Sequence, residues 1–201
     1  LTFHKLFFFF FDVSIVGVME ESKAENQNTT ATGSGIPYES LAYYNLGTAA
    51  NKSAASDYKM WALQSWVGRL NYVFDSKYLL TATFRADGSS KFPKNKWGYF
   101  PSTALGWRAS EESFIKKLNV FDNLKLRASW GVTGNQAVEP FATIPLMSTV
   151  TYSYGTASET TGYLVATPSD PNLKWEETTQ TDVGVDFGFF KNRLTISADY
   201  Y

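Results

Sequence analysis

The sequence contains no cysteine, only one histidine and nearly balanced charges, with a formal net charge of −1 over 201 residues. The lack of cysteine excludes a disulfide scaffold, a thiolate metal site and a cysteine nucleophile. A histidine-based catalytic pair could use only His4, near the start of the chain. We therefore expect no enzymatic activity, no catalytic residue, no metal ion and no cofactor. The balanced charge gives no electrostatic reason to expect a nucleic acid partner.

Long apolar runs are also missing. The longest extends from Leu6 to Phe11, far short of the roughly 20 residues that a membrane-spanning helix needs. Its five adjacent phenylalanines follow no period. We predict a strand over residues 3–20 at this end of the chain. Its apolar side would carry Phe7, Phe9, Phe11, Val13 and Ile15.

The sequence does contain a regular alternation of apolar and polar side chains. In residues 78–88, Leu80 and Phe84 fall on one side of an extended chain, and Thr83 and Arg85 fall on the other. A period of two is typical of a strand with two different faces. The same period predicts further strands, about seven with the N-terminal one, over residues 66–74, 97–109, 124–133, 182–189 and 194–200.

Such strands fit two architectures. A soluble antiparallel sandwich alternates in this way, and so does an outer-membrane barrel with an apolar face towards lipid and a polar face towards water. The aromatic residues favour the barrel, because they make up 17% of the sequence and many lie near strand ends, where barrels carry aromatic girdles. The predicted girdle residues are Tyr72, Phe74, Tyr78, Trp97, Tyr99, Trp175, Phe187, Phe189 and Phe190.

The links between the strands alternate in length, as they do in outer-membrane barrels. The compact links, which we assign to the periplasmic side, are residues 75–77, 110–123 and 190–192. The longer links, which we assign to the outside, are residues 22–57, 88–96 and 134–174.

Four local features carry predictions of their own. Ser110 is placed to cap a helical turn inside the second compact link. The polar composition of residues 22–35 predicts disorder. Asp87 and Gly88 are turn-forming residues at a strand end, where the glycine would supply a positive φ. Pro101 lacks a backbone donor, so we expect a bulge or irregular pairing there.

Several motifs follow one another in the second half of the chain. They read RADGSSKF at 85–92, GYFPS at 98–102, GWRASEE at 106–112, LKLRASWGVTGN at 124–135, NLKWEETTQTDVGVDF at 172–187 and RLTISADYY at 193–201. In this order and at this spacing they closely resemble the barrel of SusC/RagA-type TonB-linked outer-membrane transporters. The resemblance covers residues 59–201, whereas residues 1–58 form a less well-defined strand and an external loop.

The resemblance implies that residues 1–201 are part of a larger antiparallel up-and-down transmembrane β-barrel of about 22 strands with a plugged lumen. It implies a Gram-negative outer membrane and the surrounding lipid bilayer, import of glycans or peptides, a SusD-like surface lipoprotein as lid, and coupling to the TonB system. The plug domain and the TonB-binding segment are not within this sequence. We expect a fragment, because the chain lacks an initial Met and a signal peptide and ends inside a strand.

Two sets of residues are candidates for function. One set would face the lumen, either as a hydrated wall or in contact with the plug: Arg69, Arg85, Asp87, Arg108, Arg127, Asp182, Asp186 and Asp199. The other set, in the long link 134–174, would contact substrate or the lid lipoprotein: Tyr152, Tyr154 and Tyr163. Two alternatives to active import stay open, namely a passive outer-membrane barrel or adhesin and a soluble β-sandwich binding module.

Overall fold

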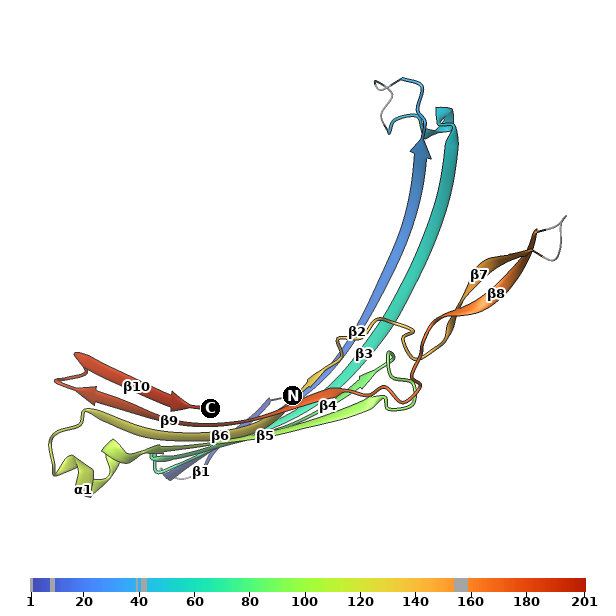
Figure 1. Cartoon of the computed structure of the whole chain (residues 1–201). Helices are drawn as coiled ribbons and strands as arrows, with labels where there is room; N and C mark the ends of the chain where they lie inside the picture. Colours follow the sequence, from blue (N-terminus) through green and yellow to red (C-terminus); the bar gives the residue numbers. More distant parts are fainter. Residues whose placement is uncertain (1, 8–9, 39, 41–42, 154–158) are drawn as a thin grey trace.

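The chain forms one curled antiparallel sheet. The computed structural model describes residues 2–7, 10–38, 40, 43–153 and 159–201, and within them the sheet has eight strands whose spatial order follows the chain. It curves like part of a barrel wall (Figure 1), which confirms the predicted all-β, antiparallel fold. The strands are β1 (Thr2–Phe7), β2 (Phe11–Ser34), β3 (Asn51–Phe74), β4 (Tyr78–Ser89), β5 (Trp97–Arg108), β6 (Asn123–Asn135), β9 (Glu176–Phe189) and β10 (Leu194–Tyr200).

The strands β2 and β3 project far beyond the rest of the sheet. Each has 24 residues, whereas β4 has 12, and the extra 12 extend the ribbon by about 40 Å (Figure 1). The prediction of disorder for residues 22–35 is wrong, because β2 pairs with β3 residue by residue up to Ser34 and Asn51. Both faces of this ribbon are exposed to solvent, so apolar and polar side chains need not alternate along its strands.

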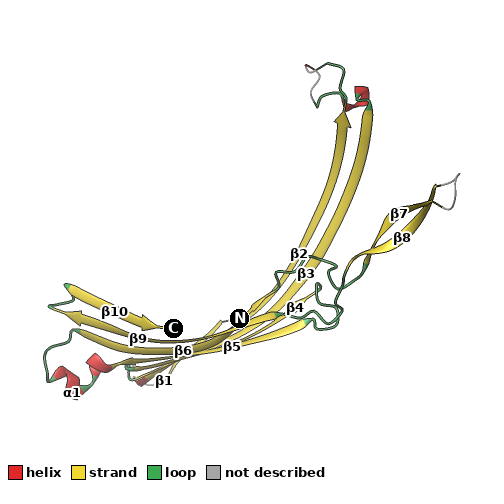
Figure 2. Cartoon of the chain, viewed as in Figure 1, coloured by secondary structure: helices red, strands yellow, loops and turns green. Residues whose placement is uncertain are grey.

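A second hairpin lies in the connection between β6 and β9, which are themselves neighbours in the sheet. The predicted long loop 134–174 contains β7 (Leu146–Ser153) and β8 (Glu159–Thr167), which pair with each other and not with the main sheet. This hairpin projects from the same end as the β2–β3 ribbon (Figure 2). The long connections therefore carry much of the ordered structure outside the wall.

The predicted N-terminal strand is in fact a hairpin. Over residues 3–20 the structure contains β1 and the first part of β2, paired from Thr2 and Val16 to Phe7 and Phe11. Phe7 ends β1 and Phe11 begins β2, and two antiparallel strands joined by a reversal do not keep the period of a single strand. Phe9, which we predicted on the apolar side, lies outside the described residues.

The compact links lie together at the other end of the sheet (Figure 1). In the link between β3 and β4, Asp75 and Ser76 both have positive φ, as the tightest hairpin turns require. The link between β5 and β6 contains the predicted helical turn, as η4 (Ala109–Glu111) and α1 (Ser113–Lys116). Ser110 does not cap it, because Ser110 is buried within η4 and no side chain caps α1. No helix in the described ranges is long and apolar enough to cross a membrane.

Two predictions at the long-loop end need correction. Asp87 and Gly88 form no turn, since β4 continues to Ser89 and Gly88 is not among the residues with positive φ. Gly88 is needed for space, because a Cβ there would lie 3.0 Å from the ring of Trp97. Pro101 causes no bulge in its pairing with β4. The irregularity lies on its other side, where the β5–β6 ladder ends at Ser102.

Beyond Pro101, a small aromatic core closes the gap between the diverging strands. Phe92, Phe100 and Trp175 are buried there, and the ring centroids of Phe92 and Phe100 lie 5.6 and 5.4 Å from that of Trp175. Trp175 was predicted in the girdle, but it is 6% exposed and its indole N–H donates to the Lys96 carbonyl oxygen. A Cβ on Gly134 would overlap the Phe100 ring, so this glycine admits the aromatic side chain.

Replacing Phe100 with alanine should loosen this core without unfolding the wall. Truncation of a fully buried phenylalanine costs about 3–5 kcal/mol, and Phe100 is 5% exposed. We expect faster proteolysis of residues 90–96 and 134–138 in the full-length protein carrying Phe100→Ala. The control is Tyr99→Ala, because neighbouring Tyr99 is 57% exposed. Equal cleavage of the two variants would contradict the assignment.

Candidate functional site: the charged face of the sheet

The strand register gathers the predicted charged residues on one face. Cross-strand partners point to the same side of a sheet, and the described pairings connect all eight positions through such partners. Arg69 pairs with Thr83, Thr83 with Ser102, and Ser102 with Gly131. These pairings, together with the alternation along each strand, place the following predicted residues on one face, which we call the charged face: Arg69, Arg85, Asp87, Arg108, Arg127, Asp182, Asp186 and Asp199.

Arg127 is the centre of a network that joins three strands. Its guanidinium binds both carboxylate oxygens of Asp186 on β9, at 2.9 and 3.1 Å, and one oxygen of Asp199 on β10 at 2.9 Å. The Ser197 hydroxyl donates to Asp186 from β10 at 2.8 Å. A forked guanidinium contact of this kind fixes geometry as well as charge. The network therefore holds β6, β9 and β10 together across their charged side.

Gly184 makes this network possible. It is the direct partner of Arg127 on one side and of Asp199 on the other. A Cβ at position 184 would overlap the Asp199 carboxylate and lie 3.0 Å from the guanidinium carbon of Arg127. Because glycine leaves this space empty, the two charged side chains meet above β9.

A separate pair lies near the long-loop end. Arg85 donates through Nε to Asp87, 2.6 Å from its nearer oxygen, and through a terminal nitrogen to the Ser65 hydroxyl at 3.1 Å. Asp87 and Ser65 are both buried. Arg69 donates to the Thr83 hydroxyl, and Arg108 to the Ser76 carbonyl oxygen. The eight charges thus share one face but form separate groups along it.

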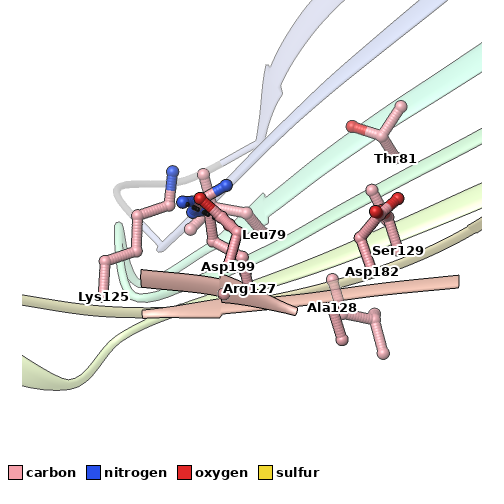
Figure 3. A pocket seen from close by; sticks show the side chains of 12 residues that line it. Leu79, Thr81, Lys125, Arg127, Ala128, Ser129, Asp182 and Asp199 are labelled. Carbon is pink, nitrogen blue, oxygen red and sulfur yellow. Dashed lines mark hydrogen bonds and ion pairs between the residues drawn. The ribbon is translucent and has the colours of Figure 1, made fainter. Parts of the chain in front are cut away.

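A hollow of about 330 Å³ opens beside the Arg127 network. In Figure 3 the side chains of Lys125, Arg127, Asp182 and Asp199 lie on one side of the ribbons, and that of Ala128 lies on the other. Asp182 accepts from the hydroxyl of Ser129 and the amide of Gln180. Lys125, Ser129 and Gly184 were not among the predicted site residues, although alternation places them on this face. The hollow offers water-accessible groups of both charges.

The two described tyrosine candidates do not form one aromatic surface. Tyr163 pairs with Thr149, whereas Tyr152 pairs with Thr160, and the spacing puts the two rings on opposite faces of the β7–β8 hairpin. Tyr152 packs over Gly162, where a Cβ would overlap its ring. Tyr163 is more open, with 68% exposure against 45% for Tyr152. Tyr154 lies outside the described residues.

The structure also bears on metal binding. Among the residues it describes, no cluster of three or more histidine, aspartate and glutamate side chains could hold a metal ion. The acidic groups of the charged face pair with arginines or accept from hydroxyls and amides instead.

A side chain at position 184 should break the link between β6 and β10. In Gly184→Val the new methyl groups would force Arg127 and Asp199 apart, and we expect a lower unfolding temperature of the full-length protein. Gly68→Val is the matched control, because a Cβ on Gly68 has no heavy atom within 4 Å and valine favours strands. Thermal unfolding followed by circular dichroism measures both. An equal shift in the two variants would refute the role of Gly184.

Comparisons with known proteins place these features in a family. The family model described as TonB dependent receptor-like, beta-barrel matches residues 8–201. TonB-dependent receptor P3 of Formosa agariphila is 37% identical over 192 residues, which cover 94% of this chain and 19% of that protein. TonB-dependent receptor SusC of Bacteroides thetaiotaomicron is 46% identical over 147 residues, 69% of this chain and 14% of that protein.

Solved structures show the same fold. The RagAB peptide importer in its closed-closed state matches 98% of this chain and 22% of its own chain, with a TM-score of 0.82 and 23% identity. The RagAB peptide transporter matches with a TM-score of 0.80. The present chain spans less than a quarter of each of these relatives. Its sequence and its curled antiparallel sheet show that it belongs to the TonB-dependent receptor-like β-barrel family.

Proposed function

We propose that this chain is a section of the barrel wall of an active, TonB-coupled transporter in the outer membrane of a Gram-negative bacterium. The observation that supports this most is the contrast between the two faces of one continuous sheet. One face carries the arginine and aspartate groups, and the other carries large apolar side chains that stay exposed. Examples from strands across the sheet are Ile15, Trp66, Phe84, Leu105, Val183 and Ile196, each 47–57% exposed.

An exposed apolar face of this extent needs a partner. In a soluble β-sandwich, a second sheet would cover Phe84 and Leu126, yet these are 52% and 41% exposed. The hydrocarbon of a lipid bilayer is the partner that fits an apolar band on the outside of a curved antiparallel sheet. This favours the barrel over the soluble binding module.

The charged face then lines the lumen. Each of its eight predicted residues already has a hydrogen-bond or ion-pair partner within the wall. This internal pairing favours a hydrated wall for most of the face. The plug, in a part of the protein outside these 201 residues, would contact the wall where groups of both charges border the hollow beside Arg127.

The cargo is an oligosaccharide, a peptide or a similar large nutrient. The RagAB peptide transporter, which shares the fold, supports a peptide. The oligosaccharide and a SusD-like surface lipoprotein as lid come from the sequence resemblance. Large cargo does not pass a plugged barrel by diffusion, so transport needs energy delivered through TonB. The chain itself supplies wall and external structure and no catalytic group.

Uptake by the full-length protein should depend on TonB. In its native host, a fluorescent oligosaccharide or peptide that supports growth should cease to enter when tonB is deleted or a protonophore is added. Entry of a small sugar through porins should be unchanged in the same cells. Uptake of the large cargo at an undiminished rate would instead identify a passive barrel, and surface binding without any uptake would identify an adhesin.

Tyr163 should contribute to binding of lid or cargo more than Tyr152 does. Its ring is open to solvent, and loss of an exposed aromatic anchor weakens an interface by about tenfold. We expect Tyr163→Ala in the full-length protein to reduce affinity for the surface lipoprotein or cargo to this extent, measured by surface plasmon resonance. Tyr99→Ala, on the wall at comparable exposure, is the control. If deletion of residues 150–165 left both uptake and partner binding intact, the hairpin would have no such role.

A further inference from the structure

The compact link between β5 and β6, residues 109–122, is fastened to the apolar side of the sheet at its start. Tyr78 and Trp107 are cross-strand partners on that side. The Tyr78 hydroxyl donates to a carboxylate oxygen of Glu112 at 2.7 Å, and the Trp107 indole N–H donates to the same oxygen at 3.4 Å. Glu112 therefore lies over the end of the apolar face and not over the charged one.

The same link is fastened to the apolar side again at its end. The ring of Phe121 packs against Phe187 and Phe189 of β9, with centroids 6.1 and 5.4 Å apart. Both β9 residues share the face of Val183 and Val185 by their spacing. Two independent sets of contacts thus place the link outside the barrel wall, at the end of the short turns.

Between these attachment points the link exposes apolar side chains. Phe114, Leu118 and Val120 are 57%, 58% and 55% exposed, and Phe190 in the adjacent β9–β10 turn is 73% exposed. Lys116 pairs with Glu111 at 2.6 Å, while the neighbouring Lys117 is exposed. The link therefore combines apolar residues and a lysine in a short amphipathic segment that continues the apolar outer face.

We propose that residues 109–122 form an interfacial anchor that binds phospholipids of the leaflet at the short-turn end. Phe114, Leu118 and Val120 enter the boundary between headgroups and acyl chains, and the Lys117 ammonium binds the phosphate of an anionic headgroup. The inference rests on the proposed function, because it needs the apolar face to lie in lipid. It adds a site that holds the wall at a fixed depth.

In this proposal Glu112 lies at the boundary between the lipid and water. The hydrogen bond from Tyr78 lowers the pKa of Glu112 below its usual range, with further help from Trp107 and Lys77. The carboxylate is therefore charged at neutral pH, and a charged group avoids hydrocarbon. Amphipathic tyrosine and tryptophan rings prefer the interface, with their polar tips towards water. The aromatic residues and the carboxylate together set the link at the lipid surface.

Spin-label depth measurements on the full-length protein in vesicles of phosphatidylethanolamine and phosphatidylglycerol test this. The present chain has no cysteine, so a label can be placed at Leu118→Cys, Phe84→Cys or Asp57→Cys in a background without other cysteines. Phe84 is on the apolar face in mid-strand, and Asp57 is on the projecting ribbon. We expect oxygen to reach the Phe84 label preferentially, a water-soluble nickel chelate to reach the Asp57 label, and the Leu118 label to lie between them.

The outcomes separate the two proposals. If the chelate reached the Leu118 label as readily as the Asp57 label while the Phe84 label stayed in lipid, the anchor proposal would be wrong and the membrane orientation would stand. A Phe84 label that resembles the Asp57 label would overturn the membrane orientation itself. For the headgroup contact, Lys117→Glu should move the Leu118 label towards water in phosphatidylglycerol vesicles but not in pure phosphatidylcholine. An unchanged depth in both would exclude the lysine–phosphate contact.

Discussion

Antiparallel pairing in a fixed register is the constraint on which the whole structure depends. Side chains alternate along each strand, so a shift of one residue in any strand would exchange its charged and apolar faces. The observed register aligns eight strands, and it brings Arg127, Gly184 and Asp199 into one row. The register thus determines which side chains share each face of the sheet.

The two ends of the sheet have different structures. At the short-turn end the chain reverses tightly, and aromatic residues gather on the apolar face around Glu112 and Phe121. At the other end the β2–β3 ribbon and the β7–β8 hairpin extend beyond the rest of the sheet (Figure 1).

The sequence predicted the strands where apolar and polar side chains alternate, but it predicted one strand over residues 3–20, where the chain forms the β1–β2 hairpin. It failed for residues 22–35 because solvent surrounds that ribbon, and it missed β7 and β8 for the same reason. The prediction for Gly88 was wrong because the sequence does not distinguish a glycine required for close packing from one required for a positive φ. Trp175 was misread because buried and girdle aromatics look alike in sequence. Alternation grouped the charges within each strand, but the pairing of Arg127 with Asp186 and Asp199 depends on inter-strand register. That the charged face lines a lumen stays a prediction.

The orientation of the sheet can be tested most directly by electron cryomicroscopy of the full-length protein in lipid nanodiscs. The lipid belt should contact Leu80, Phe84, Leu126 and Val185, and the Arg127 network should face the enclosed interior. Density that shows these four apolar side chains packed against a second layer of protein would contradict the barrel wall and, with it, the proposed transport.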